Sequence, residues 1–160
     1  MRLAVDVGTV RIGLAYSDPS GLLASALETV PRSWTPDQQE ASADLRRLVE
    51  LASHYQPIEW VVGLPLALSG RETASTADAR AFAEALSGLV NAPVRLLDER
   101  LSTVSASSQL RASGKGSRRQ RSVIDQVAAV ILLQHLLDAE RSGHLPGVLL
   151  TPPHPDRNSS

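Results

Sequence analysis

The N-terminal stretch constrains the fold more than any other part of the chain. A short apolar run that begins at Leu3 ends at the carboxylate Asp6, the chain turns at Gly8, and a second apolar run begins at Ile12. Two short β-prone runs separated by a glycine-containing turn are typical of a β-hairpin. Asp6 is then expected where the first strand leaves its sheet. A carboxylate among aliphatic neighbours needs a cation or hydrogen-bond donors. Asp6 is therefore either a ligand-binding residue or a cap for the amide of Gly8 or Thr9.

The rest of the chain alternates between predicted strands and helices. A third strand is expected within 21–30, and short apolar runs at 59–64 and 94–97 are typical of buried parallel strands. Apolar spacing predicts helices over 37–55, 76–89 and 102–112, and a mostly apolar stretch predicts a buried helix over 123–140. Thr35 and Pro36 are expected to start the first helix, and Ser122 to start the last. This order predicts an α/β fold with a mixed five-stranded sheet, first antiparallel and then parallel, flanked by helices.

Length and composition limit the class of protein. With 160 residues, we expect one domain over 1–150 and a disordered tail over 151–160, which holds three prolines and no apolar residue. The absence of cysteine excludes disulfides and cysteine-type zinc sites, so a metal site would use oxygen ligands. No apolar run approaches the roughly 18 residues of a membrane span, and no signal-peptide core is evident. We therefore expect a cytoplasmic protein with no membrane contact.

A basic cluster is hidden within a net charge of only −1. Between 111 and 121 there are five basic residues and no acid: Arg111, Lys115, Arg118, Arg119 and Arg121. Glycines and serines around them predict a flexible loop. Such a loop is either a solvated charge run or a surface that binds a nucleic-acid backbone, because arginine pairs well with phosphate oxygens. Aromatic residues make up only 3% of the chain, so recognition should depend on backbone shape and charge.

Acidic residues occur at three places where a fold usually avoids them. Asp6 ends the first strand, Asp98 and Glu99 end the 94–97 strand, and Asp125 lies in the first turn of a buried helix. Strand ends and helix starts converge on one crevice in α/β sheets. Carboxylates held that close repel unless a hard cation neutralises them. Two Mg²⁺ or Mn²⁺ ions about 4 Å apart in such a cluster form the arrangement that hydrolyses phosphodiesters.

Each acid also has a structural explanation. Ser122 and Asp125 fit a capping box, in which Asp125 accepts from the Ser122 amide. Asp98 and Glu99 can mark a plain strand end, with Glu99 paired to a neighbouring arginine, Arg95 or Arg100. Because side chains alternate along a strand, only one of the two acids should face the crevice. The strand pattern alone leaves that choice open.

Four sequence blocks resemble the YqgF (RuvX) family of small ribonuclease H-like proteins, described as Holliday-junction resolvases and as pre-16S rRNA nucleases. These blocks are DVGTVRIGLAYSD at 6–18, GLPLALSGRETASTADARAFAEAL at 63–86, DERLST at 98–103 and IDQVAAVILLQHLL at 124–137. They match the family in order and spacing and span nearly the whole chain except the tail. The resemblance implies a ribonuclease H-like fold and a nuclease site that uses Mg²⁺ or Mn²⁺, with two ions.

The resemblance also assigns the site residues. The family's catalytic and metal-binding acids fall on Asp6, on Glu99 of the DER motif and on Asp125 of the IDQ motif, which favours Glu99 over Asp98. The superfamily's nucleases often carry a fourth acid on the last helix. Here the neighbours of Asp125 supply none: Gln126, Ala128 and Ala129. Substrates would be branched DNA or the 5′ end of precursor 16S rRNA.

Further basic residues are candidates for phosphate binding. Arg11 follows the glycine turn and either contacts a phosphate or pairs with Asp18 or a sheet neighbour. Arg71, in a loop at the end of the sheet, is a second candidate. With Lys115, Arg118, Arg119 and Arg121, these residues form the predicted nucleic-acid surface.

Two other classes of function remain open on the sequence. The D-x-G-T pattern at 6–9 also opens the ATP-binding phosphotransferases of the actin and sugar-kinase type, but those need two lobes. A binding or regulatory module with an idle acid cluster is the other alternative. The oligomeric state is monomer or homodimer; Trp34, Trp60 and 148–150 are either core or a dimer surface.

Overall fold

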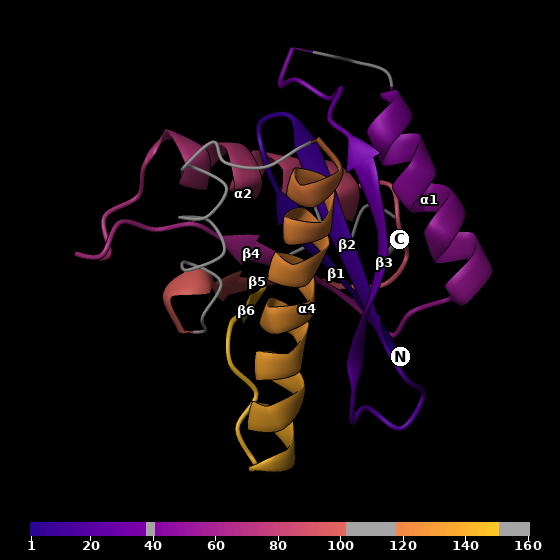
Figure 1. The fold of residues 1–160 in the computed structure, drawn as a ribbon, viewed down its shortest axis with the longest axis vertical. Helices are drawn as coiled ribbons and strands as arrows, with labels where there is room; N and C mark the ends of the chain where they lie inside the picture. Colours follow the sequence, from indigo (N-terminus) through magenta and orange to yellow (C-terminus); the bar gives the residue numbers. More distant parts are fainter. Residues whose placement is uncertain (38–40, 102–117, 151–160) are drawn as a thin grey trace, which may run out of the picture.

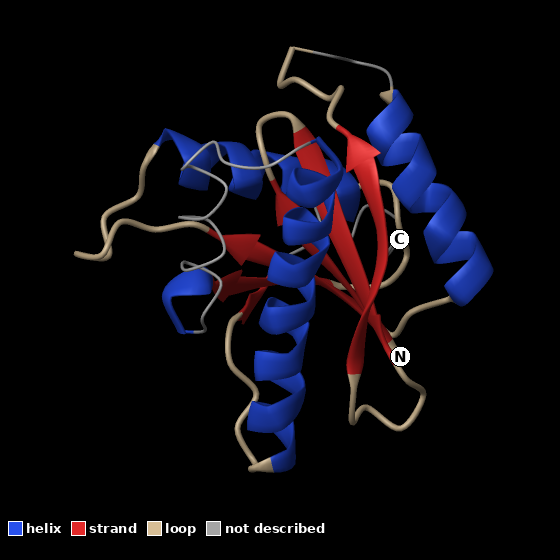
Figure 2. Ribbon diagram, in the orientation of Figure 1, coloured by secondary structure: helices blue, strands red, loops and turns tan. Residues whose placement is uncertain are grey.

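A six-stranded mixed sheet forms the centre of the computed structural model (Figures 1 and 2). The central strands β1, β4 and β5 are parallel, β2 and β3 continue the sheet antiparallel from β1, and β6 pairs antiparallel with β5. The spatial order is β3-β2-β1-β4-β5-β6. The bounds are β1 Arg2–Val7, β2 Arg11–Ser17, β3 Ala24–Pro31, β4 Glu59–Leu64, β5 Val94–Asp98 and β6 Val148–Leu149.

The structure describes residues 1–37, 41–101 and 118–150, with the backbone alone at 101 and 118–123. The predicted helix over 102–112, Lys115 and the predicted tail over 151–160 lie outside the described residues. Within the parts that are described, no helix is long and apolar enough to cross a membrane.

Helices cover both faces of the sheet. Helices α1 (Ala43–Tyr55) and α2 (Ala74–Ser87) pack on one face, and α4 (Arg118–Arg141) lies across the other, in front of the strands in Figure 1. A short 3-10 helix, η1 (Glu99–Leu101), follows β5. The predicted α/β class with flanking helices is confirmed.

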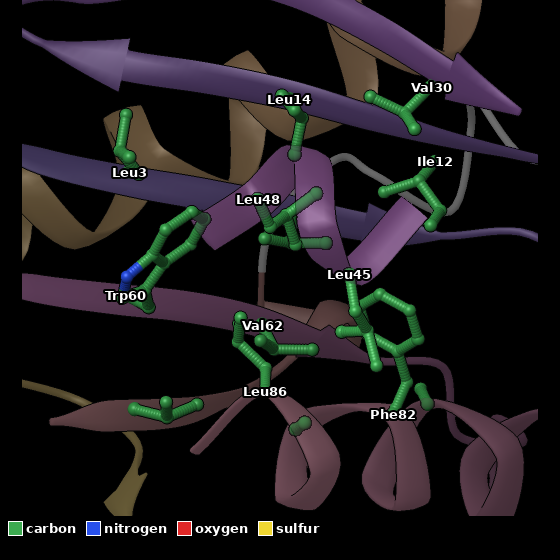
Figure 3. Packing of buried hydrophobic residues seen from close by; sticks show 14 of the residues in the cluster. Leu3, Ile12, Leu14, Val30, Leu45, Leu48, Trp60, Val62, Phe82 and Leu86 are labelled. Carbon is green, nitrogen blue, oxygen red and sulfur yellow. The ribbon is translucent and has the colours of Figure 1, made fainter. Parts of the chain in front are cut away.

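The two faces differ in side-chain size. The face toward α1 and α2 carries large residues that interdigitate with both helices, as Figure 3 shows. The strands contribute Leu3, Leu14, Trp60 and Val62, and the helices contribute Leu45, Phe82 and Leu86. On the face toward α4, strands β1, β2 and β3 present the small residues Ala4, Ala15 and Ala24, while β4 and β5 present Val61 and Leu97. Small side chains let the backbone of α4 approach the sheet closely, which places Asp125 in the site described below.

The sheet has one strand more than predicted. Residues 148–149 pair with β5 rather than only docking beside it. The chain reaches this position through Gly147, which has a positive φ of 92° and lies so close to β5 that a Cβ there would be 2.5 Å from the Leu96 carbonyl oxygen. Val148 is 69% exposed and belongs to the sheet edge, whereas Trp34 and Trp60 are buried in the core.

The predicted start of the first helix is wrong. Helix α1 begins at Ala43, with Ser42 as its N-cap, and not after Thr35 and Pro36. The carboxylate of Asp44 accepts the backbone N–H groups of Ser33 and Trp34 at 2.8 and 2.9 Å, so the segment that precedes the helix is held beside it instead of continuing it. Helix α1 ends before Pro57, as the sequence predicts.

The other two helices start earlier than predicted. Helix α2 starts after Thr73. The Thr73 hydroxyl accepts from the Thr76 amide, and the Thr76 hydroxyl accepts from the Thr73 amide. Helix α4 starts at Arg118, so Ser122 is inside the helix and is not its N-cap. The capping-box explanation for Asp125 is therefore wrong, since Asp125 lies two turns inside a longer helix.

Candidate active site

A cleft of about 450 Å³ at the carboxyl end of β1 contains three buried carboxylates. Asp6, Glu99 and Asp125 all line it, and they are 3%, 6% and 3% exposed. Its other walls come from the turn between β1 and β2, the residue after β4 and the N-terminal part of α2. The structure thus brings together the three acids that the sequence singles out as catalytic residues and metal ligands. Their chemical roles remain a prediction.

Strand alternation places Asp6 in the cleft. Leu3 and Val5 belong to the core under α1 and α2, whereas Ala4 packs with α4. Because successive side chains alternate, Asp6 lies on the α4 face with Ala4. The amide of Gly8 donates to the Arg11 carbonyl at 2.9 Å and closes the turn between the strands, so this amide already has a partner other than Asp6. Capping of the Thr9 amide by Asp6 stays a prediction.

A close contact between helix and sheet places Asp125. Asp6 is directly opposite Gly13 in the pairing of β1 with β2. A Cβ on Gly13 would lie 2.0 Å from the carbonyl oxygen of Asp125, a distance that real atoms do not adopt. The backbone of α4 therefore rests on the one residue of β2 that has no side chain. This contact brings Asp125 to the same end of the sheet as Asp6, although the two residues are 119 positions apart in the sequence.

Of the two acids after β5, Glu99 is the one in the cleft. Asp98 pairs with Arg100, whose Nη2 is 2.7 Å from Asp98 Oδ2. Burial acts to raise the pKa of Asp98, but the hydrogen bonds and charge of Arg100 outweigh it and lower that pKa. Gly63 leaves room for the other acid, because a Cβ there would be 2.6 Å from Glu99 Oε1. The explanation that pairs Glu99 with Arg95 also fails, since Arg95 binds Glu59.

Arg11 pairs with an acid of the cleft. Its Nε is 2.8 Å from Oδ2 of Asp125, and both residues line the cleft. Neither predicted ion-pair partner is used: Asp18 accepts instead from the amides of Leu22 and Leu23. Arg11 is thus positioned beside any phosphate that enters the cleft.

The remaining predicted phosphate-binding residues are more scattered. Arg71 is exposed in the loop before α2 and does not line the cleft. Arg118, Arg119 and Arg121 are in the first turns of α4 and not in a loop, so that part of the prediction is wrong. Helix α4 carries them on the N-terminal side of Asp125, with Arg121 about one turn away.

A second charged pair, which reaches the cleft through its acidic member, is not indicated by any sequence pattern. Asp78 of α2 lines the cleft, and both of its carboxylate oxygens bond to Arg32, at 2.6 and 2.9 Å. Arg32 also donates to the Gly8 carbonyl at 2.9 Å and lies over the rings of Trp34 and Phe82. Arg32 therefore connects the turn after β1 to α2. Neither Arg32 nor Asp78 lies in a charged sequence motif. Their role comes from an ion pair between residues that are 46 positions apart in the sequence.

The cleft fits a divalent cation by its donor chemistry. Carboxylate oxygens are the ligands that Mg²⁺ and Mn²⁺ prefer, and Asp6, Glu99 and Asp125 supply them within one cleft. Among the described residues, no group of three or more histidine or acidic side chains is already arranged around a single ion position. Instead, the guanidinium of Arg11 occupies Oδ2 of Asp125.

Comparisons with known proteins agree on the family. The family model described as RuvX, Holliday junction resolvase, matches residues 1–139. A protein of Clavibacter michiganensis subsp. michiganensis named "Putative pre-16S rRNA nuclease" is 58% identical over 99% of this chain and 97% of its own length. A protein of the same name from Streptomyces coelicolor is 53% identical over 91% of this chain and 85% of its own length.

A solved structure supports the fold. Thermus thermophilus RuvC in complex with a Holliday junction substrate aligns with a TM-score of 0.54 at 17% identity, over 92% of this chain and 100% of that chain. At this identity the likeness concerns the fold alone, which is of the RuvC type. The family model and the relatives go further, and this chain belongs to the RuvX family of nucleases.

Proposed function

We propose that this protein is a divalent-metal-dependent endonuclease that hydrolyses phosphodiester bonds of structured nucleic acid, with the 5′ end of precursor 16S rRNA as its first candidate substrate. The observation that carries the proposal is the convergence of Asp6, Glu99 and Asp125 on one cleft. The relatives that match nearly the whole chain carry the name of a pre-16S rRNA nuclease, which favours the RNA substrate.

Each acid has a role in this proposal. Asp6, Glu99 and Asp125 would hold Mg²⁺ or Mn²⁺, which supplies an activated water and neutralises charge on the phosphate. The carboxylates come from β1, from the end of β5 and from α4, so they surround the reacting phosphate from three sides of the cleft. Two ions remain part of the proposal, although α4 offers no further acid next to Asp125 and Asp78 is engaged by Arg32.

Nucleic acid would bind through its backbone. Arg11 lies in the cleft, and Arg118, Arg119 and Arg121 lie on the helix that carries Asp125. Arginine side chains recognise phosphate oxygens without regard to base sequence. Arg71 and Lys115 remain candidates at the periphery. Substrate choice would therefore follow backbone shape, and the protein would act in the cytoplasm, as a monomer or homodimer built on one domain over 1–150.

Resolution of branched DNA in recombination and repair is the second candidate activity. The description of the family model, Holliday junction resolvase, is the observation that favours it. A binding or regulatory module that does not cleave is the competing class of function. The two nuclease candidates differ in substrate, whereas the binding module predicts association without cleavage.

Cleavage assays with matched carboxylate variants test the proposal. A labelled pre-16S rRNA 5′ leader and a labelled four-way DNA junction are incubated with Mg²⁺ or Mn²⁺ and with wild type, Asp6→Asn, Glu99→Gln or Asp125→Asn. Each substitution should lower the cleavage rate by about 100-fold or more. Asp98→Asn is the control, because Asp98 is adjacent to Glu99 but pairs with Arg100 outside the cleft, and it should cleave normally.

The outcomes separate the candidates. Cleavage of the leader, lost in the three cleft variants and kept in Asp98→Asn, supports the rRNA nuclease. The same pattern with the junction alone supports the DNA resolvase. Binding of both substrates without cleavage by wild type would reject the enzyme and leave the binding module.

A further inference from the structure

The ion pair between Arg11 and Asp125 uses only part of the guanidinium. The Nε atom bonds to Asp125 Oδ2 at 2.8 Å, while the Arg11 side chain remains 23% exposed and that of Asp125 only 4%. Within the described part of the chain, the two Nη groups of Arg11 have no hydrogen-bond partner. Since Arg11 lines the cleft, the four N–H donors of its two Nη groups face no described partner and are available to a group that enters.

The backbones on both sides of this ion pair are held in place. The Arg11 carbonyl accepts the Gly8 amide at 2.9 Å, and the Val10 carbonyl accepts the Arg32 amide at 2.9 Å. Asp125 is held by the contact of its own backbone with Gly13. Any change in the pairing must therefore come from rotation of the long Arg11 side chain and not from movement of a strand or helix.

Arg32, which pairs with Asp78 of the cleft but does not line the cleft itself, behaves differently. Arg32 makes two bonds to Asp78 and one to the Gly8 carbonyl, and its side chain is 9% exposed. Its role is structural because its fork is already satisfied. Among the described residues that line the cleft, Arg11 is the cation, and its single bond and open fork allow it to exchange partners.

Under the proposed function, a divalent cation would compete with Arg11 as a counter-charge of Asp125. A divalent cation binds carboxylate oxygens, and Oδ2 of Asp125 is the atom that Arg11 Nε occupies. A nucleic-acid phosphate in the cleft offers Arg11 a partner for two parallel hydrogen bonds, whereas Asp125 accepts only one from it.

We propose that Arg11 is a tethered counter-ion that competes with the divalent cation for Asp125 and, once displaced, binds the backbone phosphate of the substrate. This inference rests on the proposed function. Through one side chain, cation binding would thus prepare the site for nucleic acid, and the apo cleft would carry its own positive charge. By linkage, nucleic acid that engages Arg11 would in turn strengthen cation binding.

Calorimetric titration with Mn²⁺, without nucleic acid, tests the competition. Arg11→Gln removes the competing charge and should bind Mn²⁺ about fivefold more tightly than wild type. Arg11→Lys keeps a cation, so its Mn²⁺ affinity should stay near that of wild type. Arg46→Gln is the matched control, with the same loss of charge from an exposed position on α1 outside the cleft, and should leave the Mn²⁺ affinity unchanged.

Binding of the uncut rRNA leader in Ca²⁺ tests the second half of the inference. Arg11→Gln should weaken binding by about tenfold and lower the dependence of log affinity on log salt by about one unit. Arg11→Lys should recover part of this affinity, because it keeps the charge but not the fork. A folding check by thermal unfolding accompanies each variant, and Arg11→Lys carries the test if Arg11→Gln does not fold.

Nitrogen-15 NMR observes the exchange directly. The Arg11 Nε–H signal, identified by its loss in Arg11→Lys, should shift when diamagnetic Mg²⁺ is added, and the Arg32 signal should not. Tighter Mn²⁺ and weaker RNA binding in Arg11→Gln supports the inference. Weakening of both would show a merely structural role and overturn it, as would unchanged Mn²⁺ affinity, while the nuclease proposal stands. Absence of Mn²⁺ binding to wild type would overturn both.

Discussion

Gly13 and Asp125 are in direct backbone contact, so close that a methyl group on Gly13 would lie 2.0 Å from the Asp125 carbonyl oxygen. Gly13 also pairs with Asp6 across β1 and β2. One residue without a side chain therefore brings two carboxylates of the cleft together. The geometry of the site depends on this contact as much as on the acids themselves.

Gly13→Ala should separate α4 from the sheet. The added Cβ has no space because the opposing atoms belong to the backbone, so the free energy of unfolding should fall by about 2–3 kcal/mol. Cleavage should be lost as Asp125 moves. Urea unfolding followed by tryptophan fluorescence measures the first effect. Gly88→Ala is the control, since a Cβ there meets its nearest atom at 3.6 Å, and it should be neutral or stabilising. Equal stability of the two variants would contradict the prediction.

Gly63→Ala should affect the site more than the fold. Its Cβ would be 2.6 Å from Oε1 and 3.0 Å from Cγ of Glu99, atoms of a flexible side chain that can move away. Stability should fall by only about 1 kcal/mol, whereas Mn²⁺ affinity and cleavage should each drop by about tenfold. Titration calorimetry and the cleavage assay give the comparison. A large loss of stability with intact Mn²⁺ binding would show that Gly63 serves core packing instead.

Local sequence patterns predicted most of the architecture. Alternation and helical spacing predicted the strand that carries Asp6 and the helix that carries Asp125. The family resemblance singled out Asp6, Glu99 and Asp125 as candidates, whereas the 3-10 helix that holds Glu99 was not predicted. Alternation also showed that Asp98 and Glu99 face opposite ways. It could not show which one faces the cleft, because that depends on Gly63 of β4, which makes room for Glu99 through strand pairing.

Long-range contacts account for what the sequence did not reveal. The capping pattern that ends at Asp125 is locally convincing, but α4 continues upstream because residues 118–121 are arginines and a glutamine, which favour helix. Asp78 and Arg32 are 46 residues apart and meet only when α2 packs beside the end of β3. The sequence around either residue therefore does not predict the pair.

Asp78→Asn should make the turn between β1 and β2, which follows Asp6, less rigid. It removes the charged partner of Arg32, which also holds the Gly8 carbonyl. Because the Asp78 side chain is 30% exposed, stability should fall by only about 1–2 kcal/mol. Glu72→Gln, which breaks an exposed ion pair with Arg80 beside the same helix, should have little effect. Thermal unfolding compares the two, and identical melting temperatures would argue against the role of Arg32.

Glu59 belongs to a buried charge network at the other end of the sheet, so its substitution should lower the free energy of unfolding. Its two carboxylate oxygens bond Arg2 at 2.9 Å and Arg95 at 3.1 Å, and all three side chains are buried. Glu59→Gln leaves two buried guanidinium groups short of negative charge and should cost about 3–5 kcal/mol. Glu140→Gln, which also touches Arg2 but whose side chain is 42% exposed, should cost less. Urea unfolding at pH 7 ranks the variants, and the reverse order would contradict the assignment.

Asp44 should make stability depend on pH on the acid side. Burial acts to raise its pKa, but hydrogen bonds from Ser33, Ser42, Trp34 and Leu45 outweigh that effect and lower it. A lowered pKa in the folded state means that the stabilisation is fully present above the ordinary pKa of about 3.9 and is lost as the pH falls through the folded-state value.

Asp44→Asn removes this dependence. At pH 7 the variant should be about 1–3 kcal/mol less stable, because Oδ2 accepts the amides of both Ser33 and Trp34 and Oδ1 accepts that of Leu45. An asparagine amide turns one acceptor into a donor in either orientation. The difference from wild type should shrink as the pH falls below about 4, where the wild-type carboxyl begins to be protonated. Urea unfolding at pH 7, 5 and 3, a range of about four units that includes the ordinary pKa, measures this difference in stability. A constant difference at all three values would show that the Asp44 charge does not stabilise the fold.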